Sequence, residues 1–348
     1  MAHKITIAVD AMGGDHAPDM VIDGIAQART LFPDTKFLIY GNESCVKPLL
    51  EKYVELRAAS ELIHTEDVVS SDMKPSQALR RGRQSSMGLS IQAVKDGAAD
   101  VAISAGNTGA LMALAKFMLR TMPGIDRPAL IAPLPTLRGE SVMLDLGANV
   151  ECDSNNLVQF AIMGAAYVRT VLGLSRPTVA LLNVGTEDLK GKDSIKAAAD
   201  VLKESGHLPL DFVGFVEGND IATGEVDVIV TDGFTGNVAL KTAEGTARLV
   251  TSLLGRAFKS SLFTKLGYLL SRHGLRSLKD HLDPNNHNGG VFLGLNGLVM
   301  KSHGSANAHG FASAVTSAID MAQNDLIRLI MEDLQEIAVD EEAPKVKP

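Results

Sequence analysis

Four short polar loops follow apolar runs in this sequence, and they carry its strongest candidates for chemistry. They are DAMGGD (10–15), SAGNTGA (104–110), DLGANV (145–150) and TDGFTGN (231–237). Gly, Asn and Thr offer backbone amides and neutral donors and acceptors, which can hold a phosphate or polarise a carbonyl. Open α/β sheets bind ligands beyond the carboxyl ends of their strands, so we expect the four loops to share one edge and form a polar cleft. Ordinary turns are the alternative, because Gly and Asn are common turn residues.

The stretch NVGTEDLKGKDS (183–194) offers a lysine at the start of a predicted helix. It is not a phosphate-binding P-loop, since five residues separate Gly185 from Gly191 and Asp193 stands where Ser or Thr is required. Lys192 still directly precedes a helix, and its ammonium could converge with the helix N-terminus on an anion. A solvated surface lysine is the alternative.

The stretch VMKSHGSANAHGF (299–311) places Lys301, His303 and Ser305 in a turn between a strand and a helix. His303 could act as a general acid or base near neutral pH, although a histidine in a turn more often only makes a hydrogen bond. The chain has neither a nucleophile elbow with a Ser-His-Asp order nor an HExxH motif, so a hydrolase triad or a catalytic zinc site lacks support. Cys152 could hold an acyl group as a thioester, but we expect an unactivated packing residue.

Alternating strands and helices must position these loops. Runs typical of buried strands recur, and most end in Gly, Asp or Asn: ITIAV (5–9), KFLIYG (36–41), DVAIS (100–104), ALIAPL (129–134), SVMLDLG (141–147), TVALLNVG (178–185), DFVGFV (211–216) and DVIVTDG (227–233). Helical periodicity lies between them, over 19–32, 108–120, 154–173 and 193–205, with a final helix expected at about 305–335. The alternation predicts an α/β fold, a largely parallel sheet covered by helices. We expect one domain over 1–336, in one or two lobes, and a disordered tail over 337–348.

The composition is that of a globular protein with an acidic balance. The 348 residues carry a formal net charge of −8, with 45% hydrophobic residues and a mean hydropathy of +0.11. Nucleic acid is therefore not an expected partner, because its phosphates demand a basic face. No apolar run approaches the ~18 residues of a membrane span, which favours a cytoplasmic location. The two cysteines, Cys45 and Cys152, are too few for a disulfide framework or a cysteine-rich metal site, and we expect no metal.

One segment departs from the acidic balance. Between Gly245 and Lys279 there is no Asp or Glu, whereas Arg and Lys recur and apolar residues keep helical spacing. This predicts a basic amphipathic helical hairpin at about 246–282, suited to an anionic membrane surface or an acidic protein partner. A helix pair buried in a dimer interface is the alternative. The expected contact residues are Leu254, Arg256, Phe258, Lys259, Leu262, Phe263 and Lys265.

The motifs DAMGGDHAP, SAGNTGA, DLGAN, GTEDLKGKDS, TDGFTGN and KSHGSANAHGF, in this order, resemble the bacterial phosphate acyltransferases of phospholipid synthesis, the PlsX family. The resemblance runs from about residue 5 to residue 335. It implies transfer of a long-chain fatty acyl group from acyl carrier protein to inorganic phosphate, which gives acyl phosphate. It also implies a fold similar to phosphotransacetylase and to isocitrate and isopropylmalate dehydrogenases, a homodimer, peripheral association with the inner face of the cell membrane, and no cofactor.

The resemblance also implies site residues. Lys192 and Asn237 become the catalytic candidates, with Lys192 facing the phosphate charge and Asn237 orienting phosphate or the thioester carbonyl. Phosphate is already anionic near pH 7, so the site must mainly hold it in line and stabilise the developing oxyanion. The residues implied for phosphate or substrate binding are Asp10, Gly13, Gly14, Asn107, Thr108, Asn149, His303 and Gly304. Asp10 and Asp15 are expected to orient donors, because a carboxylate in contact with phosphate would repel it.

Three other functions compete with this one. A phosphotransacetylase acting on acyl-CoA would need similar chemistry and a different carrier. A nicotinamide-dependent hydroxy-acid dehydrogenase would share the fold relation, but the GxGxxG fingerprint is missing. A membrane-surface scaffold would use the basic hairpin and leave the loops without chemistry.

Overall fold

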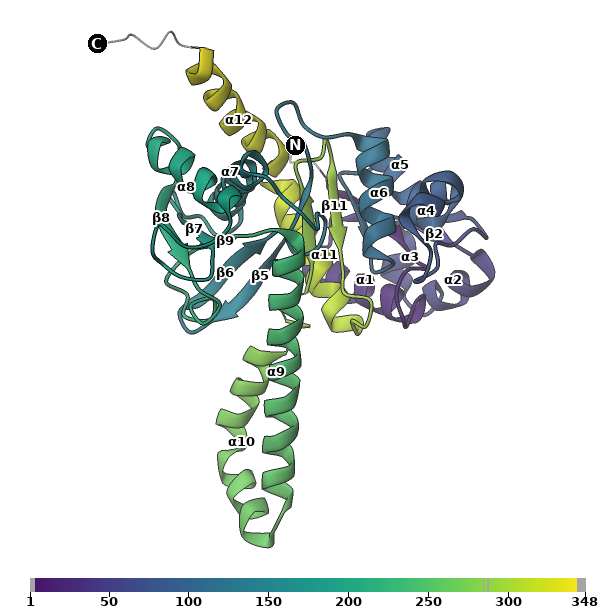
Figure 1. Cartoon of the computed structure of the whole chain (residues 1–348). Coiled ribbons are helices and arrows are strands. Elements are labelled where there is room, and N and C mark those ends of the chain that lie inside the picture. Colours follow the sequence, from purple (N-terminus) through teal and green to yellow (C-terminus); the bar gives the residue numbers. More distant parts are fainter. Residues whose placement is uncertain (1–3, 284, 287, 343–348) are drawn as a thin grey trace, which may run out of the picture.

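A computed structural model describes residues 4–283, 285–286 and 288–342. In this part of the chain, a single 11-stranded sheet has the order β3-β2-β1-β4-β11-β10-β5-β6-β9-β7-β8 (Figure 1). The expected α/β architecture, a largely parallel sheet covered by helices, is confirmed. The strands are β1 (Thr6–Asp10), β2 (Lys36–Gly41), β3 (Ser60–His64), β4 (Val101–Ser104), β5 (Ala129–Thr136), β6 (Gly139–Leu144), β7 (Thr178–Leu182), β8 (Asp211–Val216), β9 (Val228–Val230), β10 (Gly290–Leu293) and β11 (Leu298–Lys301).

Strand direction reverses across the middle of the sheet. β3, β2, β1, β4 and β11 pair in parallel, and so do β6, β9, β7 and β8. Between these groups, β11 with β10, β10 with β5 and β5 with β6 are antiparallel pairs. Three reversals leave the two parallel groups running in opposite directions. The strands before the loops at 10–15 and 104–110 therefore have their carboxyl ends on one side of the sheet. The strands before the loops at 145–150 and 231–237 have their carboxyl ends on the opposite side. Our expectation that all four share one edge was wrong.

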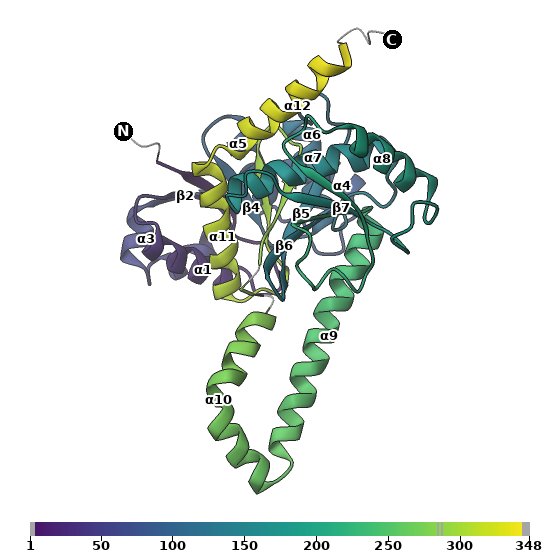
Figure 2. The ribbon, with the colours of Figure 1, turned by 90° about the vertical axis from the view of Figure 1, so that its left-hand side faces the viewer.

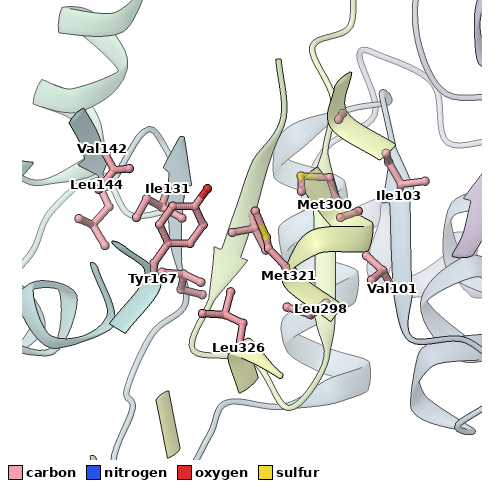
Figure 3. Packing of buried hydrophobic residues seen from close by; sticks show 14 of the residues in the cluster. Val101, Ile103, Ile131, Val142, Leu144, Tyr167, Leu298, Met300, Met321 and Leu326 are labelled. Carbon is pink, nitrogen blue, oxygen red and sulfur yellow. The ribbon is translucent and has the colours of Figure 1, made fainter. Parts of the chain in front are cut away.

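Helices cover both faces of the sheet, because successive side chains of each strand point to opposite sides. Val101 and Ile103 of β4 belong to a buried cluster with α1 (Asp19–Leu31), α7 (Ser154–Val171) and α11 (Ala308–Gln323) (Figure 3). Ala102 belongs to a second cluster with α5 (Ser86–Lys95) and α6 (Thr108–Leu119). The helices of the body are α1 (Asp19–Leu31), α2 (Glu43–Leu50), α3 (Val54–Ala58), α4 (Pro75–Arg81), η1 (Gly82–Gln84), α5 (Ser86–Lys95), α6 (Thr108–Leu119), α7 (Ser154–Val171), α8 (Asp193–Glu204), α11 (Ala308–Gln323) and α12 (Leu326–Glu342). The expected tail at 337–348 overlaps α12, which continues to Glu342, and residues 343–348 lie outside the described residues.

Two long helices form a hairpin that projects from the body (Figures 1 and 2). They are α9 (Gly233–Lys259) and α10 (Leu262–Leu282), capped at their N-termini by the side chains of Asp232 and Ser261. α9 starts well before the expected position of about 246, because the helix that opens at TDGFTGN continues unbroken into the basic segment. Its first turns consequently lie within the body of the protein and only the remainder projects. Among the described helices, none has the length and apolar character needed to cross a membrane.

Candidate active site

A cavity with a volume of about 1470 Å³ lies over the centre of the sheet, between the N-terminal half of α9 and the loops of the first strand group. Its lining combines apolar side chains with polar and charged groups. The apolar lining includes Leu130, Leu134, Met143, Leu146, Leu240 and Val250. The polar lining includes Gly14, Asp15, Asn107, Thr108, Gly147, Asn237, Lys241, Glu244, Lys301, His303 and Gly304. The cavity thus combines an apolar lining with groups that can bind a charged or polar ligand.

At one end of the cavity, the buried carboxylate of Asp145 holds the loop after β6. It accepts backbone hydrogen bonds from Leu130 (3.0 Å), Gly147 (3.2 Å), Ala148 (3.0 Å) and Asn149 (2.6 Å), and a fifth from the side-chain amide of Asn149 (2.8 Å). Burial raises the pKa of Asp145, while these hydrogen bonds oppose the rise. The Asn149 amide also donates to the carbonyl of Pro128 at 2.7 Å, so Asn149 is occupied in holding this loop. Asn149 does not line the cavity.

The first turn of α9 packs directly on this loop because two of its residues are glycines. A Cβ at Gly236 would lie 2.0 Å from the backbone oxygen of Asp145, and one at Gly233 would lie 2.6 Å from the backbone oxygen of Asn149. The close approach brings Asn237 to the cavity wall beside Gly147. Within the described chain, the carboxamide of Asn237 has no hydrogen-bond partner. Its donor and acceptor are available to a ligand.

Lys192 lies at the N-terminal end of α9 and outside the cavity lining. Its ammonium is 3.0 Å from a carboxylate oxygen of Asp232, and its side chain is 69% exposed. The other carboxylate oxygen of Asp232 accepts from the backbone amide of Thr235 at 2.7 Å. Burial acts to raise the pKa of Asp232, but hydrogen bonds from Thr235 and the pairing with Lys192 lower it overall. The structure brings Lys192 to the same helix start as Asn237 without placing it in the cavity.

At the opposite end, a second buried carboxylate supports the glycine loops. Asp10 accepts from the hydroxyl of Ser104 at 2.6 Å and from the backbone amide of Met12 at 3.2 Å. Burial raises its pKa, and these hydrogen bonds oppose the rise. A Cβ at Gly13 would lie 2.5 Å from Asp10 and 2.7 Å from the backbone nitrogen of Gly106. Asp10 and Gly13 therefore lie behind the cavity wall and support the residues that line it.

The lining of this end includes residues of the loops at 10–15, 104–110 and 302–307 and of the segment 68–71. Gly14 has a φ of +116°, which favours glycine, and its neighbour Asp15 donates a backbone hydrogen bond of 2.8 Å to the carbonyl of Gly304. Asn107 caps α6 by accepting from Ala110, and its amide donates to backbone carbonyls of the 71–73 segment. The Asn107 side chain is thus structural, and the helix start at Thr108 faces the cavity.

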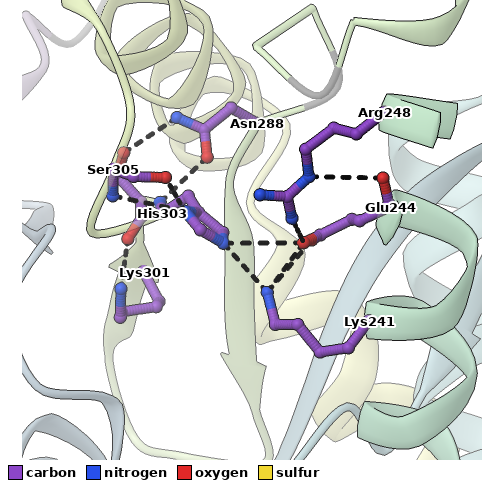
Figure 4. A network of polar contacts seen from close by, with 8 residues as sticks. Lys241, Glu244, Arg248, Asn288, Lys301, His303 and Ser305 are labelled. Atoms are coloured by element: carbon purple, nitrogen blue, oxygen red, sulfur yellow. Dashed lines mark hydrogen bonds and ion pairs between the residues drawn. The ribbon is translucent and has the colours of Figure 1, made fainter. Parts of the chain in front are cut away.

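A network of charged and polar groups lies at this end (Figure 4), and its residues come from α9, from the loop after β11 and from the segment before β10. The ammonium of Lys241 lies 2.9 Å from Nε2 of His303 and 3.0 Å from Oε2 of Glu244. Glu244 also pairs with Arg248 at 3.2 Å. The backbone amide of His303 donates to the side-chain oxygen of Asn288 at 2.9 Å. Burial, followed by the charge of Lys241, lowers the pKa of His303, which favours a neutral imidazole at pH 7.

Sequence reasoning missed Lys241 and Glu244. One signal was available: Lys241 is four residues after Asn237, so the two share a face of α9 one turn apart. The spacing alone could not identify Lys241 as a site residue, because the sequence does not show which face of α9 lies over the sheet.

Cys152 is not equipped for nucleophilic chemistry. Burial raises its pKa to about 12, with further contributions from the charges of Asp145 and Asp232. The thiol is therefore protonated at neutral pH and packs against the core. Among the described residues, no group of three or more His, Cys, Asp or Glu side chains is arranged to hold a metal ion.

The residues expected to contact a membrane or carrier protein lie on the projecting hairpin. Leu262 and Phe263, at its tip, are 82% and 88% exposed. Leu254 and Phe258 are half-buried, and Phe258 packs edge-on against Tyr268 of α10 with ring centroids 5.7 Å apart. Arg256, Lys259 and Lys265 are exposed around the same tip.

The chain resembles known proteins over nearly its whole length. A family model described as "Fatty acid synthesis protein" matches residues 5–329. The phosphate acyltransferase of Paramagnetospirillum magneticum is 55% identical over 331 residues, which cover 94% of each chain. That of Rhodospirillum centenum is 56% identical over 348 residues, which cover 100% of this chain and 98% of the relative.

Solved structures with a similar fold are phosphotransacetylases. The EutD phosphotransacetylase from Staphylococcus aureus superposes with a TM-score of 0.59 at 16% identity, over 92% of this chain and 95% of that one. A phosphotransacetylase from Streptococcus pyogenes gives a TM-score of 0.58 at 18% identity, over 91% and 94% of the two chains. These likenesses confirm the expected phosphotransacetylase-related fold. The extent of the family match and relatives more than half identical show that the chain belongs to the bacterial phosphate acyltransferase family.

Proposed function

We propose that this protein transfers a long-chain fatty acyl group from acyl carrier protein to inorganic phosphate and releases acyl phosphate for phospholipid synthesis. The observation that carries the proposal is the cavity, whose lining joins apolar side chains to polar loops from both parallel strand groups, in a chain of the phosphate acyltransferase family. An acyl chain needs the apolar part and a phosphate needs the polar part. Burying each methylene of the chain contributes about 0.8 kcal/mol to its binding.

The reaction needs no covalent intermediate on the protein. A phosphate oxygen attacks the thioester carbonyl, the carbon–oxygen bond forms and the carbon–sulfur bond breaks, and the electron pair leaves with the carrier's sulfur. The protein must hold phosphate in line with the carbonyl and stabilise the oxyanion that develops. The protonated, half-buried thiol of Cys152 fits a mechanism without an acylated cysteine.

The proposed roles follow from the positions of the residues. Asn237 offers a free carboxamide at the cavity wall, suited to orient phosphate or the thioester carbonyl. Lys192, at the start of the same helix, contributes positive charge near that end and reaches a ligand by exchanging its pairing with Asp232. Gly14, Asn107, Thr108, His303 and Gly304 line the cavity, and Asp10, Gly13 and Asn149 hold the lining loops in place.

The hairpin supports a role at a surface. Its tip presents Leu262 and Phe263 to solvent in a segment without carboxylates between residues 245 and 279. This combination suits an anionic membrane, and the basic residues also suit an acidic carrier protein. We propose peripheral association with the inner face of the cell membrane, and a homodimer as the working unit.

The test uses purified protein, palmitoyl-carrier protein and inorganic phosphate, with acyl phosphate trapped by hydroxylamine. We expect product from the carrier-protein donor, reduced about 10²-fold in Asn237→Ala, as for loss of one oriented donor at a reacting centre. Asn219→Ala is the matched control, since Asn219 is an exposed surface asparagine outside the cavity lining. Product from palmitoyl-CoA alone would show a phosphotransacetylase instead. No product from either donor, together with vesicle binding, would leave a membrane-surface scaffold.

A further inference from the structure

Lys301, the last residue of β11, is a buried cation without a carboxylate partner. It is 8% exposed, and its ammonium contacts the backbone oxygens of Ala105, at 3.5 Å, and Ser302. No carboxylate of the described residues lies within ion-pairing distance of this ammonium. A buried charge without a counter-ion is costly, so a lysine kept there needs a compensating group.

Lys301 is one of the residues that line the cavity, as are Ala105, His303 and Gly304 near it. The carboxylate of Glu244 already pairs with Lys241 and Arg248, so it is not free to neutralise Lys301. The carboxylates of Asp15 and Asp10 attract the Lys301 ammonium from a longer distance, and the ammonium of Lys241 repels it. The cavity lining holds the carboxylates of Asp15, Glu244 and Asp283 beside Lys241 and Lys301. Glu244 pairs with Lys241, whereas none of the three carboxylates pairs with Lys301.

Backbone groups at the same place also favour an anion. Thr108 and Gly109 line the cavity as the first residues of the 12-residue helix α6. Amides at the first positions of a helix have no intrahelical partner, and the helix dipole adds positive potential there. Gly14 and Gly304 line this end without side chains, which lets a ligand approach the backbone closely.

We propose that Lys301, together with Lys241 and the N-terminus of α6, forms an oxyanion site of the phosphate type, and that inorganic phosphate occupies it as the acyl acceptor. The identification of the anion rests on the proposed function; the existence of the site does not. This role differs from that of Lys192, which is solvent-exposed and already paired with Asp232. The ammonium of Lys301 supplies a counter-charge to phosphate inside the cavity whose apolar lining would hold the acyl chain.

The test is phosphate binding without any acyl donor, measured by calorimetry and by the shift in melting temperature. Lys301→Met keeps the apolar stem and removes the charge. We expect its affinity for phosphate to fall at least tenfold, while its ligand-free melting temperature equals or exceeds that of the wild type. A merely structural lysine would give the opposite pattern, a lower melting temperature with unchanged affinity. Lys203→Met, which removes a surface lysine of α8 paired with Asp188, should bind phosphate as the wild type does.

Three further measurements distinguish the possible ligands. Chloride at equal ionic strength should give no comparable rise in melting temperature, which would exclude simple charge screening as the cause of the phosphate effect. Dimethyl phosphate stands in for the phosphodiester of a carrier protein's prosthetic arm. If Lys301→Met weakens this diester and leaves phosphate affinity unchanged, the site binds the carrier arm and our assignment is wrong. If Lys301→Met fails to fold, Lys241→Gln tests the same site from its exposed side, and unchanged phosphate affinity in it contradicts the proposal.

Kinetics separate this inference from the proposed function. Absence of acyl phosphate with the wild type overturns the function and leaves the binding result standing. Normal activity in Lys301→Met with an unchanged KM for phosphate overturns the inference alone.

Discussion

The ammonium of Lys241 lies 2.9 Å from Nε2 of His303, although the two residues are 62 positions apart in the sequence. α9 starts just after the carboxyl end of β9 and runs across the sheet. It thereby brings Lys241 to the carboxyl end of β11, which lies just before His303 in the chain. The contact therefore joins polar loops that belong to opposite edges. The four loops follow strands of opposite direction, yet residues from all four line one cavity, because α9 crosses between them.

The packing of α9 on the loop after β6 can be tested at its glycines. Gly236→Ala would place a Cβ 2.0 Å from the backbone oxygen of Asp145, so helix or loop must move. We expect the free energy of unfolding to fall by about 1–3 kcal/mol, as for overpacked interiors, and the activity to fall further because Asn237 is displaced. Urea unfolding and the hydroxylamine assay measure the two effects.

Gly245→Ala is the matched control on the same helix. A Cβ there would meet nothing within 4 Å, so only the helix propensity changes. We expect stabilisation by about 0.5–1 kcal/mol with activity retained. Equal effects of the two substitutions would show that α9 is not held at Gly236.

The fold class and the residues of the loops could be predicted from the sequence, whereas the meeting of the loops could not. Apolar runs and helical periodicity identify β1, β4, β6, β9 and their helices, because each buries a continuous pattern. The reversal depends on β10 and on the direction of β5. β10 has only four residues, and an apolar run reads the same for either strand direction. Lys301 stood out in the sequence only as part of a turn with His303, and Lys241 not at all. Tertiary packing was needed to show that both line one cavity.

Phosphate binding should depend on pH through Lys301. Burial, with a further contribution from Lys241, lowers the pKa of Lys301 to about 8. Below pH 8 the ammonium is charged and can pair with phosphate, and above it the charge is lost. We therefore expect the dissociation constant for phosphate to rise between about pH 7.5 and pH 9 in the wild type. Titration calorimetry over this range, with Lys301→Met as the comparison, measures the part that belongs to this lysine.

The same shift predicts a difference in stability. Because the folded-state pKa lies below the unfolded-state value, the unfolded chain binds the extra proton between about pH 8 and pH 10. Stability from this group is lowest below pH 8 and increases as the pH rises through that window. The stability advantage of Lys301→Met over the wild type should therefore shrink from pH 7 to pH 10. An advantage that stays constant over this range would contradict the assignment.

Cys152 should be dispensable for the chemistry. Its pKa of about 12 leaves almost no thiolate at pH 7, so no acyl group should transfer to it. We expect Cys152→Ala to retain acyl phosphate formation, with at most a modest loss of stability from the smaller side chain. Mass spectrometry of the wild type during turnover should find no acylated Cys152. An acylated peptide containing Cys152, together with an inactive Cys152→Ala, would replace direct transfer by a two-step mechanism.

The hairpin tip should govern membrane binding separately from catalysis. Leu262 and Phe263 are almost fully exposed and far along the hairpin from the cavity lining, which on α9 ends at Val250. We expect the double substitution Leu262→Asp and Phe263→Asp to abolish sedimentation with vesicles containing anionic lipid, because two apolar contacts are lost and two negative charges are added. Activity toward a soluble acyl-carrier protein in the absence of vesicles should change less than twofold.

Leu174→Asp, which changes an exposed leucine of the body, is the matched control and should leave vesicle binding intact. Retained sedimentation of the tip variant would move the lipid contact to another surface, and loss of activity in solution would place carrier-protein recognition at the tip.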